Sequence, residues 1–139
     1  MTAAPPPPGL AGLLGLDGDG VLFADERAAA RLVAGCRAAG YTVVEVDTAG
    51  VTEFRTAQAR IADALRLPGN ADRNLDALAD ELTELARYWP WDDRLVLLWR
   101  HPEELIAADA AGWCRLADVL AEATERRFET LLLIRGYDG

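Results

Sequence analysis

Five consecutive apolar residues, Leu95-Val96-Leu97-Leu98-Trp99, constrain the fold more than any other segment of this chain. A strand with one face in water alternates apolar and polar residues, whereas a continuous apolar run is typical of a strand covered on both faces. Strands of that kind belong mainly to parallel sheets, because the crossover connections place helices on the sheet. We therefore predict a strand over residues 94–100 in a parallel sheet.

Two further segments have the composition of strands. Residues 41–47 (YTVVEVD) are rich in β-branched side chains, and residues 128–134 (FETLLLI) are the other predicted strand. Helical patterns surround these strands, over residues 24–40, 52–67, 74–88 and 109–127. Strands that alternate with helices predict an α/β fold, with a small, mainly parallel sheet of three strands covered by helices.

Capping residues set the predicted helix ends. Ala24 or Asp25 begins the first helix, and Gly40 ends it. Thr52 is the predicted N-cap of the second helix, and Asn74 is the predicted N-cap of the third.

The first 40 residues are predicted to form two parts. Residues 1–9 include four consecutive prolines and predict a solvated, Pro-rich tail. Residues 10–40 contain two short apolar runs, Leu13–Leu16 and Val21–Phe23, around a Gly-rich turn. Each run is a candidate strand, and together they are a candidate hairpin, followed by the helix over 24–40. We predict an extension over 10–40 that packs on a domain over 41–139.

Composition limits the classes of function. The chain has 139 residues, enough for one domain, and a net charge of −9, which argues against nucleic acid as a direct partner. The charge fits a basic protein partner and fits simple solubility equally well. The N-terminus lacks a basic leader, and no apolar run is long enough to span a bilayer, so we expect a cytoplasmic protein. In that setting Cys36 and Cys114 are predicted to be buried free thiols.

A row of acidic residues marks the segment over 68–85. Its four leucines, Leu75, Leu78, Leu82 and Leu85, recur at helical spacing and predict one apolar face. Asp72, Asp76 and Asp80 recur every four residues and predict a second, acidic face. Like charges at this spacing destabilise a helix by a few tenths of a kcal/mol each, roughly. A favourable interaction with the helix dipole would account for Asp76, but it reaches Asp80 poorly.

Residues 74–82 (NLDALADEL) resemble the signature of the barstar family, small intracellular inhibitors of secreted microbial ribonucleases. The signature is an Asn, an apolar residue, Asp-Ala-Leu and a further Asp, and it follows a Leu-Pro and a short loop. The order of elements from Tyr41 to Ile134 also resembles that family. The resemblance implies a barstar-like three-layer fold, to which residues 10–40 would add a strand or a hairpin and a helix.

The resemblance also implies a site and a partner. Asp80 matches the family aspartate that enters the phosphate site of the ribonuclease, and Asp76 matches the first aspartate of the motif. Glu122 matches an acidic rim residue on the last helix. The predicted partner-binding residues are Asp76, Asp80, Asn74, Asp72, Arg73 and Glu122. The partner would be a basic protein, a microbial ribonuclease or toxin, bound by a protein that is a monomer when free and uses no enzyme chemistry, cofactor or metal.

The loop before the acidic helix differs from the family pattern. The family commonly has aromatic residues and a glycine there, and this chain has Asn70, Ala71 and Asp72. Trp89 and Trp91 are alternative sources of an aromatic surface. A first alternative function is therefore an immunity or scaffold protein that keeps the fold and binds a different basic protein.

A Gly-rich acidic motif and a single histidine are the remaining candidates for catalysis. Asp17-Gly18-Asp19-Gly20 resembles the first motif of haloacid-dehalogenase-like phosphatases, which gives a remote alternative with Asp17 and Asp19 in catalysis. The chain has no lysine to hold the phosphate, so a turn is preferred. His101 is the single histidine, and without a positioned Ser, Cys or second acid we predict a structural role for it.

Overall fold

The computed structural model describes residues 9–14, 16, 20–92, 94–124 and 127–137. Four strands form one sheet, β1 (Val21–Asp25), β2 (Thr42–Asp47), β3 (Leu95–Arg100) and β4 (Phe128–Ile134). Their order across the sheet is β1-β4-β3-β2, and every pair is parallel. The predicted parallel sheet and its three strands are confirmed, and β1 is the additional N-terminal strand.

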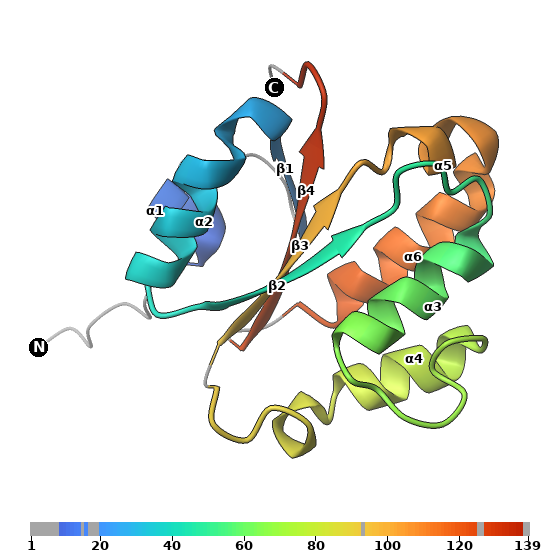
Figure 1. Cartoon of the computed structure of the whole chain (residues 1–139). Coiled ribbons are helices and arrows are strands. Elements are labelled where there is room, and N and C mark those ends of the chain that lie inside the picture. Colours follow the sequence, from blue (N-terminus) through green and yellow to red (C-terminus); the bar gives the residue numbers. More distant parts are fainter. Residues whose placement is uncertain (1–8, 15, 17–19, 93, 125–126, 138–139) are drawn as a thin grey trace, which may run out of the picture.

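Helices cover both faces of the sheet (Figure 1). One face carries α1 (Leu10–Leu14) and α2 (Ala29–Ala38), which follows the short 3-10 helix η1 (Glu26–Ala28). The other face carries the remaining helices, which are α3 (Phe54–Ala64), α4 (Leu75–Leu82) with the 3-10 helix η2 (Leu85–Arg87), α5 (Glu103–Ala108) and α6 (Ala110–Glu122). The result is the expected three-layer α/β arrangement.

The apolar run of β3 divides between two cores. Successive side chains of a strand point to opposite faces. Leu95, Leu97 and Trp99 therefore pack with α3, α4 and α6, and Val96 and Leu98 pack on the side of α1 and α2. All five are completely buried, which confirms that the strand is covered on both faces.

Several predicted ends differ from the structure. The candidate hairpin is wrong, because residues 10–14 are helical and β1 pairs with β4. The predicted start of the first helix is too early, because Asp25 ends β1 and caps η1, accepting a hydrogen bond from the Arg27 amide at 2.8 Å. Gly40, with φ of 90°, does end that helical segment.

The helices after β2 also differ in detail. Thr52 is not the cap of α3, whose N-cap residue is Glu53 and whose Phe54 amide lies 3.4 Å from the Asp109 carboxylate. The acidic helix ends at Leu82 instead of about residue 88, because the Thr83 and Glu84 amides bond to carbonyls three residues back. The last helix ends at Glu122, and α5 is an additional helix that the sequence patterns did not indicate. Cys36 is buried as predicted, whereas Cys114 is exposed, and both thiols are free.

Candidate protein-binding site

Helix α4 presents an acidic face to solvent. Asn74 caps the helix, and its side-chain oxygen accepts a hydrogen bond from the Ala77 amide at 3.1 Å. This places Asp76 in the first turn, where the helix dipole stabilises a carboxylate, and Asp80 one turn further along the same face. Leu78 and Leu82 are buried on the opposite face, so packing of these leucines holds both aspartates outward.

Neither aspartate is neutralised by an ion pair within the described part of the chain. Both are exposed, and among the described residues no arginine forms an ion pair with either carboxylate. The last turn of α4 also contains no basic residue. Repulsion between the two carboxylates is therefore not offset within this part of the chain, and a partner that supplies positive charge would relieve it.

Glu122 lies across a shallow hollow from this face. The hollow has a volume of about 160 Å³ and is lined by Ala79 and Thr83 of the α4 segment and by Val119, Glu122 and Ala123 of the α6 segment. On a helix, residues three and four apart are neighbours, so Ala79 and Thr83 share the side of α4 that carries Asp76 and Asp80. Glu122 thus lies across the hollow from the side of α4 that carries Asp76 and Asp80.

Asp72 and Arg73 lie apart from that face. Both precede the cap residue Asn74, so Asp72 does not continue the acidic row along the helix, and that part of the prediction is wrong. The Asp72 carboxylate and the Arg73 guanidinium form an ion pair at 3.4 Å. They sit in the loop that leads into α4, where they border the site without lining its hollow.

The loop before α4 is fixed by polar contacts to α3. The Gln58 amide nitrogen donates to the Ala71 carbonyl at 2.9 Å, and Arg55 donates to the Arg73 carbonyl. Ala71 is completely buried. The loop therefore offers a set backbone shape, although it lacks the aromatic side chains of the family pattern.

The tryptophans after α4 separate into one buried and one exposed residue. The Trp89 ring is buried, its Nε1 donates to the Leu65 carbonyl at 2.8 Å, and the Arg66 guanidinium lies 4.1 Å from the ring centroid. Trp91 is 93% exposed. Of the two candidates for an aromatic contact surface, only Trp91 is available to a partner.

Sequence reasoning missed the lining of the hollow. Thr83, Val119 and Ala123 are ordinary residues in the sequence, and only the packing of α4 against α6 places them beside the acidic face. The one available signal was spacing: Thr83 follows Asp76 by seven residues and Asp80 by three, and both spacings place it on the same side of a helix as those aspartates.

The strand and helix order from β2 to β4 agrees with a known family. The family model described as Barstar (barnase inhibitor) matches residues 41–134, more than half of the chain. The chain belongs to the barstar family. Searches of the curated proteins and of the solved structures found no match. The matched range begins with the residue before β2 and ends with β4, so α1, β1 and α2 lie outside the barstar match.

The remaining candidate sites give no comparable arrangement. Asp17 and Asp19 lie outside the described residues. A phosphatase motif of that kind follows a strand, but the apolar run before Asp17 includes helix α1, and β1 begins only after Gly20. Within the described part of the chain, no group of three or more His, Cys, Asp or Glu residues has metal-binding geometry. In the same residues, no helix is long and apolar enough to cross a membrane.

Proposed function

We propose that this protein binds a basic microbial ribonuclease or related toxin and blocks its active site with the acidic face of α4. The observation that carries the proposal is the pair of exposed carboxylates of Asp76 and Asp80, which form no ion pair with any described residue, with Glu122 across the adjoining hollow. Membership of the barstar family, whose model is described as a barnase inhibitor, supports the same function.

The chemistry of such a target explains the arrangement. Ribonucleases that cleave through a cyclic phosphate hold their substrate with arginine, lysine and histidine side chains. Carboxylates presented at the same positions can form charge-assisted hydrogen bonds with those groups. The net charge of −9 would also steer a basic enzyme toward the inhibitor and raise the association rate at low salt.

Roles within the site are assigned by resemblance to the barstar family. Asp80 is assigned to the phosphate site of the enzyme, Asp76 to basic residues beside it and Glu122 to the rim. Asn74 holds the helix start that orients both aspartates, and the loop residues Asp72 and Arg73 border the contact. The expectation that one aspartate dominates the binding energy is carried over from the family.

The test is calorimetric titration of the protein with a barnase-type ribonuclease at low and moderate salt. We expect tight binding that weakens with salt, because exposed charges are screened over about 10 Å at 0.1 M ionic strength. Asp80→Ala is expected to lose at least about 2 kcal/mol of binding free energy, the range of an interface hot spot. Glu122→Ala is expected to lose less, since it lies at the rim.

Asp63→Ala is the matched control, because Asp63 is an exposed aspartate on a different helix, α3. It removes the same charge and is expected to leave the affinity nearly unchanged. An equal loss in Asp63→Ala and Asp80→Ala would show that only net charge matters and would contradict the assigned site.

A second candidate function has one observation in its favour. The loop over residues 70–73, which borders the site, has no aromatic residue, and its Arg73 is paired with Asp72. An immunity or scaffold protein that binds a different basic partner through α4 would retain the salt dependence and the effect of Asp80→Ala, but it would not bind the barnase-type enzyme.

A further inference from the structure

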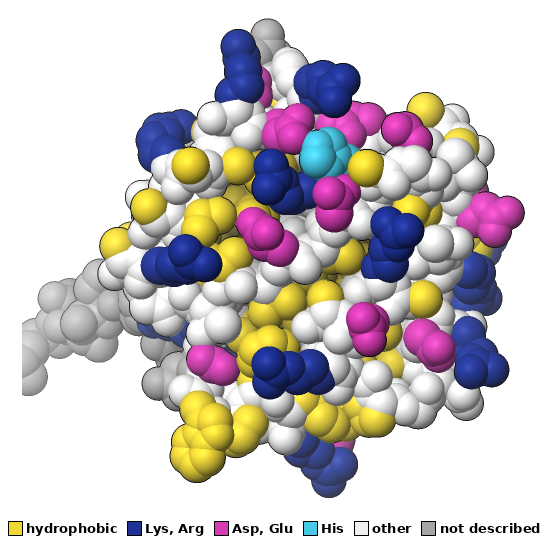
Figure 2. Space-filling view, in the orientation of Figure 1, with side chains coloured by type: hydrophobic (Ala, Val, Ile, Leu, Met, Phe, Trp, Pro, Cys, Tyr) yellow, Lys and Arg dark blue, Asp and Glu magenta, His cyan; other side chains and the backbone are white. Residues whose placement is uncertain are grey.

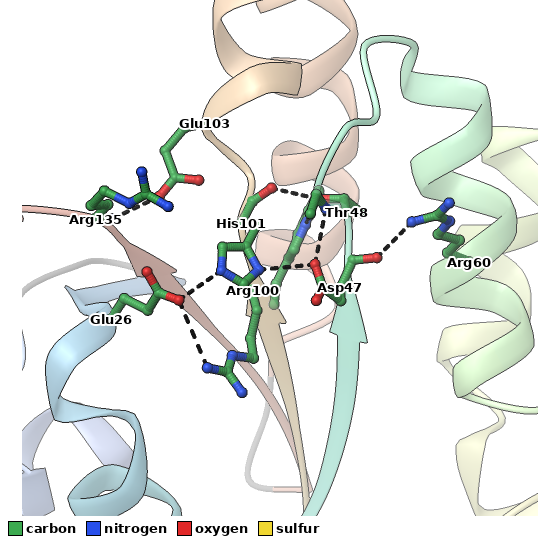
Figure 3. Close-up of polar contacts among 10 residues, drawn as sticks. Glu26, Asp47, Thr48, Arg60, Arg100, His101, Glu103 and Arg135 are labelled. Carbon is green, nitrogen blue, oxygen red and sulfur yellow. Dashed lines mark hydrogen bonds and ion pairs between the residues drawn. The ribbon is translucent and has the colours of Figure 1, made fainter.

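Charged side chains gather where the four parallel strands end (Figure 3). Glu26 follows β1, Asp47 is the last residue of β2, and Arg100 and His101 end and follow β3. The carboxyl ends of parallel strands meet at one edge of a sheet, which brings these residues together although they are far apart in the sequence. Glu26 belongs to the N-terminal segment (residues 10–40), whereas the other three belong to the part that matches the barstar family.

The imidazole of His101 connects the two parts. Its Nδ1 lies 2.9 Å from Asp47 Oδ1, and its Nε2 lies 2.6 Å from Glu26 Oε1. A neutral imidazole carries only one N–H, so a ring that donates to carboxylates at both nitrogens is an imidazolium. In the neutral ring, one nitrogen lone pair would face a carboxylate.

The backbone fixes the ring in this position. His101 has φ of 58°, the left-handed region that non-glycine residues seldom adopt. The Thr48 hydroxyl donates to the His101 carbonyl at 3.0 Å and holds the strained residue on the edge of the sheet. This backbone conformation and the bond from Thr48 hold the imidazole between its two ionic partners.

The two carboxylates differ in their other partners. Asp47 Oδ1 also accepts a hydrogen bond from the Ala49 amide at 2.9 Å. Glu26 has only Arg100 besides the histidine among the described residues, with Nη2 at 3.8 Å from Oε1. Loss of the ring proton therefore weakens the hold on Glu26 more than the hold on Asp47.

Other charged groups surround the cluster without bonding to the ring. Arg60 of α3 donates to the Asp47 carbonyl at 2.8 Å. A hollow of about 410 Å³ beside His101 is lined by Glu103 and Glu104 of α5 and by Arg135 after β4. On the side of β1, Asp25 and Arg27 form their own ion pair at 2.9 Å. The histidine side chain is 25% exposed, so water reaches it through the hollow.

We propose that His101 is a proton-dependent clasp between the N-terminal segment and the barstar domain. The protonated ring binds Glu26 and Asp47 together and holds η1 against the carboxyl edge of the sheet. When the ring loses its proton, it releases Glu26. Helix η1 and the adjoining end of β1 are then held less firmly against the carboxyl edge of the sheet.

The direction of the pH effect follows from the electrostatics. The hydrogen bond to Asp47, with further support from Glu26, raises the pKa of His101 above its ordinary value of about 6.5, and partial burial opposes this only in part. The clasp therefore contributes its full stability below about pH 6.5, the pKa of the unfolded chain. That contribution is lost as the pH rises through the higher pKa of the folded protein.

The first test is NMR titration of the ring. His101 is the only histidine, so its imidazole signals belong to one residue. We expect the midpoint in the folded wild type to lie above the ordinary value and to fall in Glu26→Gln. A midpoint at or below the ordinary value in the wild type would overturn the proposal.

The second test is urea unfolding between about pH 6 and pH 9, where histidine changes charge and carboxylates do not. The wild type is expected to lose stability as the pH rises, and His101→Gln to lose much less over the same interval. Glu26→Gln should reduce the pH dependence, whereas Asp63→Asn, which removes an exposed charge that does not bond to the ring, should keep the wild-type slope. Equal slopes in the wild type and His101→Gln would overturn the proposal.

Hydrogen exchange separates a clasp from general stabilisation. After correction for the intrinsic pH dependence of exchange, protection of the amides in β1 and η1 should fall with rising pH more than protection in β3. Uniform loss of protection across the sheet would contradict a clasp that acts on the N-terminal segment. These outcomes are independent of ribonuclease binding, because α4 is not involved.

Discussion

At the scale of single residues, a buried polar pair supports the end of β3. Thr48 and Trp99 are completely buried, and the Trp99 Nε1 donates to the Thr48 hydroxyl at 2.8 Å. The Trp99 ring meets Trp113 edge to face, with centroids 5.4 Å apart. Tryptophan buries a large apolar area, but its N–H requires a partner when water is excluded. Thr48 provides that partner and also bonds to His101.

Thr48→Val is expected to destabilise the protein by about 1–3 kcal/mol, because valine has the same shape but leaves the indole N–H buried and unsatisfied. Urea unfolding followed by tryptophan fluorescence measures the change. Thr56→Val on the exposed surface of α3 is the control and should change stability little. Similar losses in both variants would show that the hydroxyl of Thr48 has no special role.

A second buried polar group lies in the core under α1 and α2. The Glu129 carboxylate is within 3.2 Å of the Leu10 amide and accepts a hydrogen bond from the Tyr41 hydroxyl at 2.5 Å. Burial and this bond raise the pKa of the Tyr41 hydroxyl well above its ordinary value. The bonds connect α1 and the start of β2 to β4, so one carboxylate joins the added segment to the barstar domain.

At the scale of elements, a glycine allows α3 and α6 to pack closely. A Cβ at Gly112, in the first turn of α6, would lie 2.6 Å from Phe54 Cδ1 and would also meet the Asp109 carboxylate. Gly112 is buried, and its amide is bonded to the Asp109 side chain at 3.0 Å. Close contact between the two helices therefore explains a glycine where alanine would favour the helix.

Gly112→Ala is expected to destabilise the protein by about 1–3 kcal/mol, because the added methyl group forces Phe54 out of its position. Thermal unfolding of the single variants and of the double variant Gly112→Ala/Phe54→Leu measures the effect. The shorter, more flexible leucine should relieve part of the clash, so the two changes should not add. Simple additivity would contradict the contact as the cause.

One helix cap comes from a residue adjacent in sequence, and another comes from a residue distant in sequence. The predicted cap of α4 is confirmed, because Asn74 bonds to the helix through its own side chain. The predicted cap of α3 at Thr52 is wrong, because the Phe54 amide instead lies near Asp109, which is distant in the sequence. A cap that depends on a residue from another helix leaves no local signal.

At the scale of the whole molecule, the N-terminal segment completes the sheet. It supplies the edge strand β1 and helices α1 and α2, which cover the second core; the buried side chains of that core include Leu22, Leu32, Cys36, Val96, Leu98, Leu131 and Leu133. Without it, the apolar residues of β3 and β4 on that face would meet water. Figure 2 shows one face of the folded molecule, on which both charged and apolar side chains reach the surface.

A chain that begins at Tyr41 retains the range that matches the barstar family but exposes this face. We expect it to be unfolded or aggregated, because exposed apolar area costs about 25 cal/mol per Å² and large apolar patches promote association. Circular dichroism and analytical ultracentrifugation measure fold and association. A monomeric, cooperatively folding fragment would contradict the prediction, and its ribonuclease affinity would then show whether the segment affects the site.

The sequence by itself determined the elements with strong local patterns. Each of these elements buries one or both faces, and the order of apolar side chains along the chain encodes that burial directly. The patterns are the continuous apolar run of β3, the β-branched composition of β2 and the helical spacing of Leu75, Leu78 and Leu82. The same spacing placed Asp76 and Asp80 together on the exposed face of α4. The short motif in that helix, together with the order of elements from Tyr41 to Ile134, indicated the barstar family.

Only the tertiary structure decided how distant segments meet. It assigned residues 21–25 to an edge strand, because pairing with β4 outweighed an ambiguous local pattern. It placed Glu122 beside α4, and it removed Asp72 from the acidic face by beginning the helix after Asn74. It also brought Glu26 and Asp47 to the two nitrogens of His101. Such contacts join residues separated by tens of positions, and their energies arise only once the sheet aligns its strand ends.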